Sequence, residues 1–417
     1  MPVGGTSPLE LKAISGVRIG TASAGISQTH RDDLTLFELA EQTRVAAVFT
    51  NNKFCAAPVT LAKKHLSLTT PRYLLINSGN ANAGLGDAGI QAAQLCCNEL
   101  AKAVGFKETQ VLPFSTGVIG EPLPVEKLVG GLQTAVDTLS EKNWSKAAQA
   151  IMTTDTCEKG CSRSINLEGV EVTVTGIAKG SGMIKPDMAT MLSYIATDMP
   201  ISKALLEQML KEAVDLSFNR ITVDGDTSTN DAVVLMATAM ADVAPLDATA
   251  DPRYSLILSA IQEVCYFLAE AIVRDGEGAT KLIKIQVEQA QSQHDAKEVA
   301  YTVAHSPLVK TAFFASDPNW GRILAAIGRA DIERLDVENV SIYLADTCIV
   351  KNGQRYAGYT EEQGQQAADH GLNHSAGAGG QPAQRGAGVL GGGAGHRTGC
   401  SAPILIRWSF CWNPSVT

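Results

Sequence analysis

Segments with the apolar spacing of helices alternate along this chain with short segments of strand period, and this alternation limits the folds open to it. Ser202 is a plausible N-cap for one of the helical segments. Helices are expected at 87–105, 201–218 and about 254–273, and strands at 72–77, 171–177, 281–290 and 341–350. Because the strands do not recur at regular βαβ spacing, the pattern favours a layered α/β sandwich with much antiparallel pairing.

Composition excludes several classes of function. Apolar residues make up 45% of the 417 residues, enough for a large buried core. A formal net charge of −9 disfavours nucleic acid and anionic membranes as partners. The N-terminus has no basic segment followed by an apolar one, and no apolar run reaches about 18 residues. Nine cysteines without framework spacing favour reduced thiols, and Cys157 and Cys161 lack the second pair that zinc requires. We expect a soluble cytoplasmic protein without a metal ion, a nucleic-acid partner or a membrane partner.

The composition changes at Gly364. Residues 364–400 are rich in glycine with little apolar periodicity, and two tryptophans fall within the last ten residues. Such a segment cannot offset an ordering cost of about 1–2 kcal/mol per residue, so we predict disorder from about Gly364 onward. It is either a flexible tail or, the reading we favour, the product of a reading frame shifted near Gly364.

The stretch KGSGMIKPDMATML at 179–192 has the composition of a self-cleaving segment. A threonine hydroxyl is a weak nucleophile unless a base lies beside it, and an N-terminal threonine supplies that base through its own α-amine, with a pKa of about 8. Flexible glycines permit the close approach that attack on the preceding carbonyl requires, and the small Ala189 keeps that carbonyl reachable. Thr190 is therefore a candidate nucleophile, although the residues alone also fit an ordinary junction between a loop and a strand.

Eight short motifs occur in an order and at separations that resemble those of the ornithine acetyltransferase family, also called bifunctional glutamate N-acetyltransferase or ArgJ. The resemblance covers about residues 8–363. The motifs are VFTNN (48–52), NSGNANAG (77–84), STGVIG (115–120), MTTDT (152–156), KGSGMIKPDMATML (179–192), DGDTSTND (224–231), DGEGATK (275–281) and DPNWGRI (317–323).

This resemblance implies a layered αββα-type sandwich, shared with some self-processing aminopeptidases, and cleavage between Ala189 and Thr190. The products would be an α chain (1–189) and a β chain with a body (190–363) and the atypical tail (364–417), assembled as α2β2. Thr190 would accept an acetyl group from N-acetylornithine and pass it to glutamate in arginine biosynthesis. Some members also use acetyl-CoA as the donor, and no other cofactor is implied.

The resemblance also assigns roles to other residues. Thr116 and Gly117 match the pair that forms the oxyanion hole. Lys179 and Glu277 match residues that bind the substrate, as does Thr190. Thr153 is the favoured substrate threonine of its motif, with Thr154 and Thr156 as alternatives in register. From the residues alone, Lys179 fits an exposed surface lysine better, Glu277 also fits an ordinary acidic turn, and Thr116 and Gly117 also fit a common turn.

One departure from the family bears on the reaction. The family ends in a short segment whose asparagine and hydroxyl residue close over the substrate, and this chain has no such ending after Gly364. Asn413 lacks the matching neighbours. Two alternative functions stay open: an aminopeptidase or amidase, because water could replace glutamate as the acceptor, and a processed but inactive protein, because of the abnormal tail.

Overall fold

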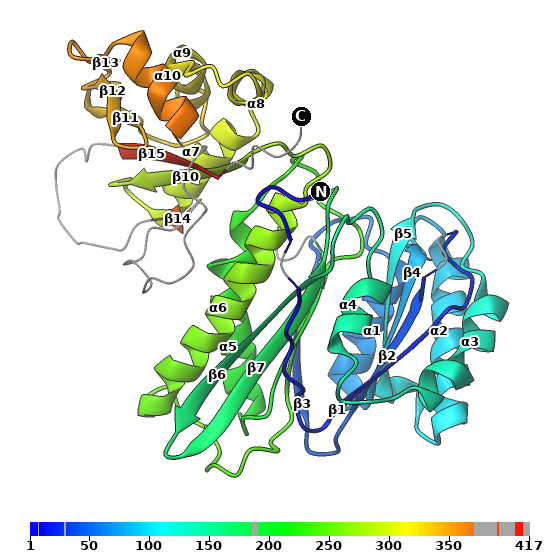
Figure 1. The fold of residues 1–417 in the computed structure, drawn as a ribbon. Helices are drawn as coiled ribbons and strands as arrows, with labels where there is room; N and C mark the ends of the chain where they lie inside the picture. The colour runs from blue at the N-terminus through cyan, green and yellow to red at the C-terminus, as the bar shows by residue number, and fades with distance from the viewer. Residues whose placement is uncertain (7, 29–30, 186–190, 371–389, 392–404, 412–417) are drawn as a thin grey trace. The chain divides into compact units, whose positions relative to one another are not determined.

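The computed structural model describes residues 1–6, 8–28, 31–185, 191–370, 390–391 and 405–411 (Figure 1). The chain divides into two compact units. The large unit is Ser7–Glu277, and the small unit combines Met1–Thr6 with Gly278–Thr417. The candidate site lies in the large unit.

Two sheets form the centre of the large unit. The first sheet has the strand order β1-β2-β4-β5, made of Val17–Ala22, Leu34–Leu39, Tyr73–Asn80 and Val111–Val118. The second sheet has the order β3-β9-β8-β7-β6, made of Arg44–Phe49, Ala232–Ala237, Leu192–Thr197, Val170–Lys179 and Lys159–Leu167. Most neighbouring strands are antiparallel, while β4–β5 and β8–β9 are parallel.

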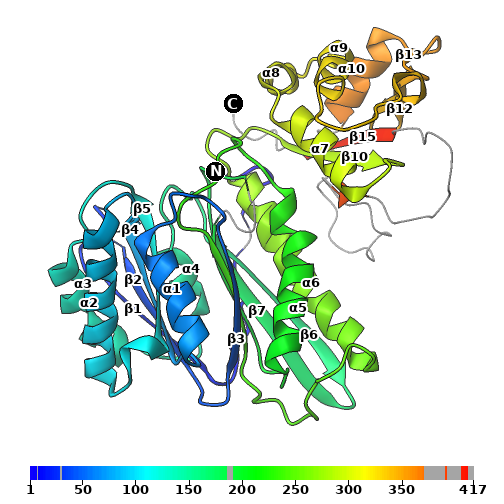
Figure 2. The same ribbon diagram turned by 180° about the vertical axis from the view of Figure 1, so that it is seen from behind.

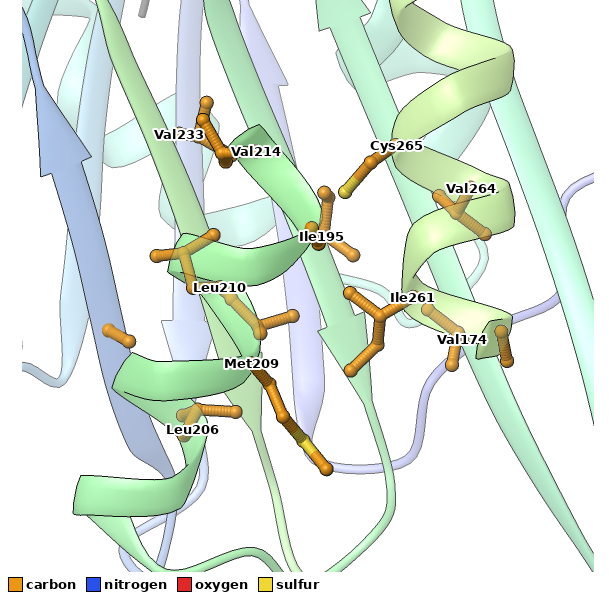
Figure 3. Close-up of a cluster of buried hydrophobic side chains, with 14 of the residues drawn as sticks. Val174, Ile195, Leu206, Met209, Leu210, Val214, Val233, Ile261, Val264 and Cys265 are labelled. Atoms are coloured by element: carbon orange, nitrogen blue, oxygen red, sulfur yellow. The ribbon is translucent and has the colours of Figure 1, made fainter. Parts of the chain in front are cut away.

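Helices cover the outer face of each sheet. The first sheet carries α2 (Gly86–Val104) and α3 (Val125–Asp137), and the second carries α5 (Lys203–Asp215) and α6 (Pro252–Arg274), as Figure 2 shows from behind. Figure 3 shows apolar side chains of α5 and α6, such as Met209 and Ile261, against Val174, Ile195 and Val233 of the second sheet. Burial of this apolar surface stabilises the contact between helices and sheet.

The two sheets also pack on each other through their inner faces. Phe37 of the first sheet contacts Tyr194 of the second, with 5.2 Å between ring centroids. The same layer includes Val59 of α1 (Ala57–Leu68) and Trp144 of α4 (Trp144–Ala150). The layers therefore run helix, sheet, sheet, helix, which confirms the predicted αββα sandwich.

The small unit has one sheet with helices packed on it. Its strand order is β13-β12-β11-β15-β10-β14, made of Gln354–Arg355, Thr347–Lys351, Ser341–Leu344, Leu405–Cys411, Leu282–Glu288 and Leu390–Gly391. Its helices are α7 (Gln293–Ala304), α8 (Pro307–Phe314), α9 (Trp320–Ile327) and α10 (Glu361–His370). Val299, Ile323 and Ile342 lie in its core. Short 3-10 helices occur at Glu108–Gln110, Phe218–Arg220 and Val337–Asn339 of the chain.

Most of the elements expected from periodicity are present, and two expectations were wrong. Residues 341–350 form two antiparallel strands, β11 and β12, because Ala345 adopts a left-handed conformation (φ 50°) in the turn between them. Disorder from Gly364 onward is contradicted at two places. Gly364 lies inside α10, and β15 pairs with both β10 and β11, where strand neighbours satisfy its backbone groups. The division of the chain at 189/190 and 363/364 stays a prediction. The boundary between the compact units is a different one, between Glu277 and Gly278.

Among the residues that the structure describes, one helix, α6, is long and apolar enough by composition to cross a membrane. Its apolar side, which includes Ile257, Val264 and Leu268, packs instead in the core of the second sheet. It therefore has the features of a core helix in a globular unit.

Candidate active site

The alternation of side chains along two strands turns Thr116 and Lys179 towards each other. In β5, Leu112 and Phe114 face the layer between the sheets, and Thr116 follows them at the same period of two. In β7, Ile177 faces that layer, and Lys179 follows it. The Lys179 ammonium donates a hydrogen bond to the Thr116 hydroxyl at 3.1 Å, and both side chains are buried.

Gly117 lies at a point where β5 approaches β4 very closely. It pairs with Gly79 across the two parallel strands and has a φ of 136°. A Cβ at Gly117 would lie 2.2 Å from the carbonyl carbon of Gly79. Only glycine fits this position without displacing the backbone, so the residue type is fixed by close approach as well as by conformation.

Asp155 holds the loop that precedes β6 against the end of β7. Its Oδ1 accepts hydrogen bonds from the Gly180 backbone N–H at 2.6 Å and from the Lys159 ammonium at 2.7 Å, and its Oδ2 accepts one from the Thr153 N–H at 3.0 Å. Burial by itself would raise the pKa of Asp155, but the charges of Lys179 and Lys159 and the hydrogen bonds from Lys159 and Gly180 lower it to about 2. Asp155 is therefore a buried carboxylate.

Asp275 completes this arrangement from the loop after α6. Its carboxylate accepts a hydrogen bond from Lys159 at 2.6 Å and two from Thr156, one from the backbone and one from the hydroxyl. Its backbone carbonyl accepts a hydrogen bond from the Ser181 hydroxyl at 2.6 Å. Asp155, Lys159 and Asp275, each almost fully buried, are called here the aspartate–lysine network.

Lys179 has an environment distinct from that of Lys159. Burial lowers the pKa of Lys179, while the charges of Asp155, Asp231 and Glu277 oppose this effect. Asp231 is itself buried, and burial raises the pKa of its carboxyl well above the usual range. Among the described residues, its Oδ2 has no hydrogen-bond partner. Lys179 thus lies among acidic groups in a region that water does not reach freely.

The predicted residues are distributed as follows. The Glu277 carboxylate lies against Gly182, where a Cβ on Gly182 would be only 2.5 Å from Glu277 Oε1. The Glu277 N–H donates a hydrogen bond to the Ser181 carbonyl. Thr153 is half-buried, and its carbonyl accepts a hydrogen bond from Arg31. Thr154 and Thr156 are both exposed, and Thr156 bonds to Asp275.

Ala189 and Thr190 lie outside the described residues. Met191, which follows Thr190 in sequence, accepts a hydrogen bond from the Ala232 N–H at 2.9 Å. Leu192 pairs with Lys179 across β7 and β8. The described chain therefore resumes next to Lys179.

Sequence reasoning missed Asp155, Lys159 and Asp275. One signal was present in the sequence: Asp155 and Lys159 are four residues apart and so form a plausible ion pair. A buried acidic residue usually needs such a partner. Asp275, however, is 116 positions from Lys159 and only tertiary structure brings it there. No group of three metal-ligating side chains occurs among the residues that the structure describes.

These features define a class of protein: an αββα sandwich with a buried polar site between its two sheets. The chain matches the profile of the ArgJ family over residues 18–373. It belongs to the ArgJ family, whose members are acyltransferases of arginine biosynthesis.

Individual relatives agree with this assignment. The chain is 52% identical over 361 residues to the arginine biosynthesis bifunctional protein ArgJ of Pseudomonas fluorescens, covering 86% of this chain and 89% of the relative. It is 55% identical over 358 residues to the protein of that name from Methylococcus capsulatus, covering 86% and 87%.

Solved structures of family members give partial matches. The ArgJ structure from Bacillus halodurans is 33% identical with a TM-score of 0.40, and covers 43% of this chain and 96% of that one. An ornithine acetyltransferase from Mycobacterium tuberculosis, solved in complex with ornithine, is 29% identical with a TM-score of 0.38, and covers 43% and 98%.

Proposed function

We propose that this chain cleaves itself before Thr190 and then transfers an acetyl group from N-acetylornithine to glutamate through an acetyl-Thr190 intermediate. The observation that carries the proposal is the buried contact between Lys179 and Thr116. It lies at the end of β7, which pairs with the strand that begins two residues after Thr190. A candidate oxyanion donor and a candidate substrate-binding ammonium thus lie beside the start of β8, the strand that follows the candidate nucleophile in sequence.

Self-cleavage begins with attack of the Thr190 hydroxyl on the carbonyl of Ala189. The peptide C–N bond breaks and an ester forms, which water hydrolyses to leave a free carboxylate on Ala189 and a free α-amine on Thr190. That amine then serves as the base, taking the hydroxyl proton as the oxygen attacks the acetyl carbonyl of N-acetylornithine. Ornithine leaves with the proton, and the glutamate amine attacks the resulting ester to restore Thr190.

Thr116 and Gly117 would stabilise the tetrahedral oxyanion in both half-reactions. Because Lys179 donates its hydrogen bond to the Thr116 oxygen, the Thr116 hydroxyl proton is left to point at another acceptor. The Gly117 N–H would be the second donor, on a residue that is exposed at the end of its strand. Two preorganised donors aimed at a developing negative charge lower the barrier most where water is excluded.

Substrate binding would use the charges of Lys179 and Glu277. The Lys179 ammonium suits the α-carboxylate that N-acetylornithine and glutamate share, and the Glu277 carboxylate suits the ammonium of ornithine. Thr153 would add a hydrogen bond. Acetyl-CoA as a second donor, the α2β2 assembly and a cytoplasmic location complete the proposal.

The proposal is tested on the purified protein. Wild type is expected as two fragments, the second beginning TMLSY, and the Thr190→Ala variant as one chain. N-acetylornithine alone should leave one acetyl group on Thr190 by mass spectrometry, and initial-rate plots against both substrates should be parallel. An intact wild-type chain, or intersecting lines without an adduct, contradicts the mechanism.

The products separate the alternatives. Acetylglutamate after addition of glutamate supports the transferase. Free acetate in its place indicates an amidase, and the absence of both indicates a processed but inactive protein.

A further inference from the structure

We propose that Asp155, Lys159 and Asp275 act as positioning residues, which join the three substrate-binding segments of the site, those of Thr153, Lys179 and Glu277, into one rigid unit. They also hold the Asp155 carboxylate at the Gly180 N–H, next to Lys179 in sequence. The inference rests on the proposed function and deepens it. None of the three side chains needs to touch the substrate, because each acts through a residue that does.

The contacts of the network reach all three segments. The Asp155 carboxylate binds the Thr153 N–H in one segment and the Gly180 N–H, next to Lys179, in the second. Asp275 reaches the second segment again through its carbonyl and the Ser181 hydroxyl. Asp275 also lies two residues before Glu277, which defines the third segment.

Lys159 joins the two carboxylates. Its ammonium lies 2.7 Å from Asp155 Oδ1 and 2.6 Å from Asp275 Oδ2, and the three side chains are at most 1% exposed. Charge-assisted hydrogen bonds in such a site are short and strong, so they restrict the movement of the loops that carry them. A displacement of about 1 Å in a substrate-binding group can cost on the order of a hundredfold in rate. Restricting these loops therefore matters for turnover.

The charges in the network also bear on Lys179. Two carboxylates and one ammonium leave one excess negative charge, and the ammonium of Lys179 balances it. Burial has the largest effect on the pKa of Lys179 and lowers it; the charges of Asp155, Asp231 and Glu277 raise it, and that of Lys159 lowers it. Asp155 is the strongest of the three favourable charges. Its removal should lower the pKa of Lys179, and Lys179 must be protonated to bind a carboxylate.

The key variant is Asp155→Asn, which is nearly isosteric and leaves Lys159 paired with Asp275. We expect its KM for N-acetylornithine to rise at least about tenfold, and kcat to change less than about threefold. The basic limb of the profile of log(kcat/KM) against pH should move down by at least about one pH unit. Asp155→Glu, which keeps the charge, should leave that limb in place.

Two further variants separate positioning from charge. Asp275→Asn leaves Lys159 paired with Asp155, so it should raise KM without moving the basic limb. Asp198→Asn is the matched control. Asp198 accepts a hydrogen bond from the Thr173 N–H near the opposite end of β7, so this variant should have wild-type KM and pH dependence. Circular dichroism and thermal melting confirm that each variant is folded.

Ornithine binding measured by calorimetry between pH 6 and pH 9 provides a readout that does not require turnover. A folded Asp155→Asn protein with wild-type KM, wild-type ornithine affinity and an unmoved basic limb overturns the inference. Wild-type protein that binds ornithine but transfers no acetyl group contradicts the proposed function alone, and calorimetry on the variants then still tests the network.

Discussion

The stability of the large unit should depend on the ionisation of Asp155. The pKa of this carboxyl falls from 3.8 to about 2 in the folded chain. Because the folded pKa is the lower one, the carboxylate stabilises the fold above about pH 4, and this contribution is lost as the pH falls through about 2. The difference in pKa corresponds to about 2 kcal/mol at pH 7, of which about 1 kcal/mol remains at pH 3.

The measurement is the free energy of unfolding in urea for wild type and Asp155→Asn, at pH 7 and at pH 3. Titration of the carboxylates remote from Asp155 is common to both proteins and cancels in the difference between them. That difference should therefore shrink by about 1 kcal/mol on going from pH 7 to pH 3. Asp251→Asn is a useful comparison. A hydrogen bond from Arg253 also lowers the pKa of Asp251 to about 2, but solvent reaches that pair and added salt should weaken its effect. A difference between wild type and Asp155→Asn that stays constant or grows towards pH 3 would refute the reasoning.

Three further predictions concern the catalytic residues. Thr116→Ala should slow both acetylation and deacetylation of the enzyme by about 10²–10³-fold, as measured by single-turnover kinetics of each half-reaction. An effect on one half-reaction alone would contradict a shared oxyanion site. Lys179→Ala and Glu277→Ala should raise KM more than they lower kcat, since their proposed partners are the fixed charges of the substrates; unchanged KM values would remove both from the binding site. Gly117→Ala should destabilise the fold and abolish turnover, because its Cβ would overlap the Gly79 backbone. Gly120 is also at positive φ but has no atom within 4 Å of its Cβ, so Gly120→Ala should lower the free energy of unfolding by only about 1 kcal/mol. Equal thermal melts for the two variants would argue against the close approach.

Local patterns predicted many of the elements correctly. The strand at 72–77 corresponds to β4 and the helix at 201–218 to α5, with Ser202 at its N-cap position. Their periods reflect which face is buried, and that information is contained in neighbouring residues. The pattern failed at 341–350, where the left-handed turn at Ala345 divides one apparent strand into two. It failed again at 405–411, which follows a glycine-rich stretch of low complexity. There β15 forms by pairing with β10 and β11, two strands that are distant in sequence.

The sequence by itself determined the family, through motifs whose order and spacing are specific, and it identified Thr116, Lys179 and Glu277 as candidates. Only the tertiary structure decided which groups meet. The hydrogen bond from Lys179 to Thr116 spans 63 positions, and that from Lys159 to Asp275 spans 116. Such contacts depend on strand register and on how two sheets pack, and neither is encoded in a short stretch of residues. For this reason, the network that joins the substrate-binding segments was not visible in the sequence, although one of its pairs, Asp155 and Lys159, lies within five consecutive residues.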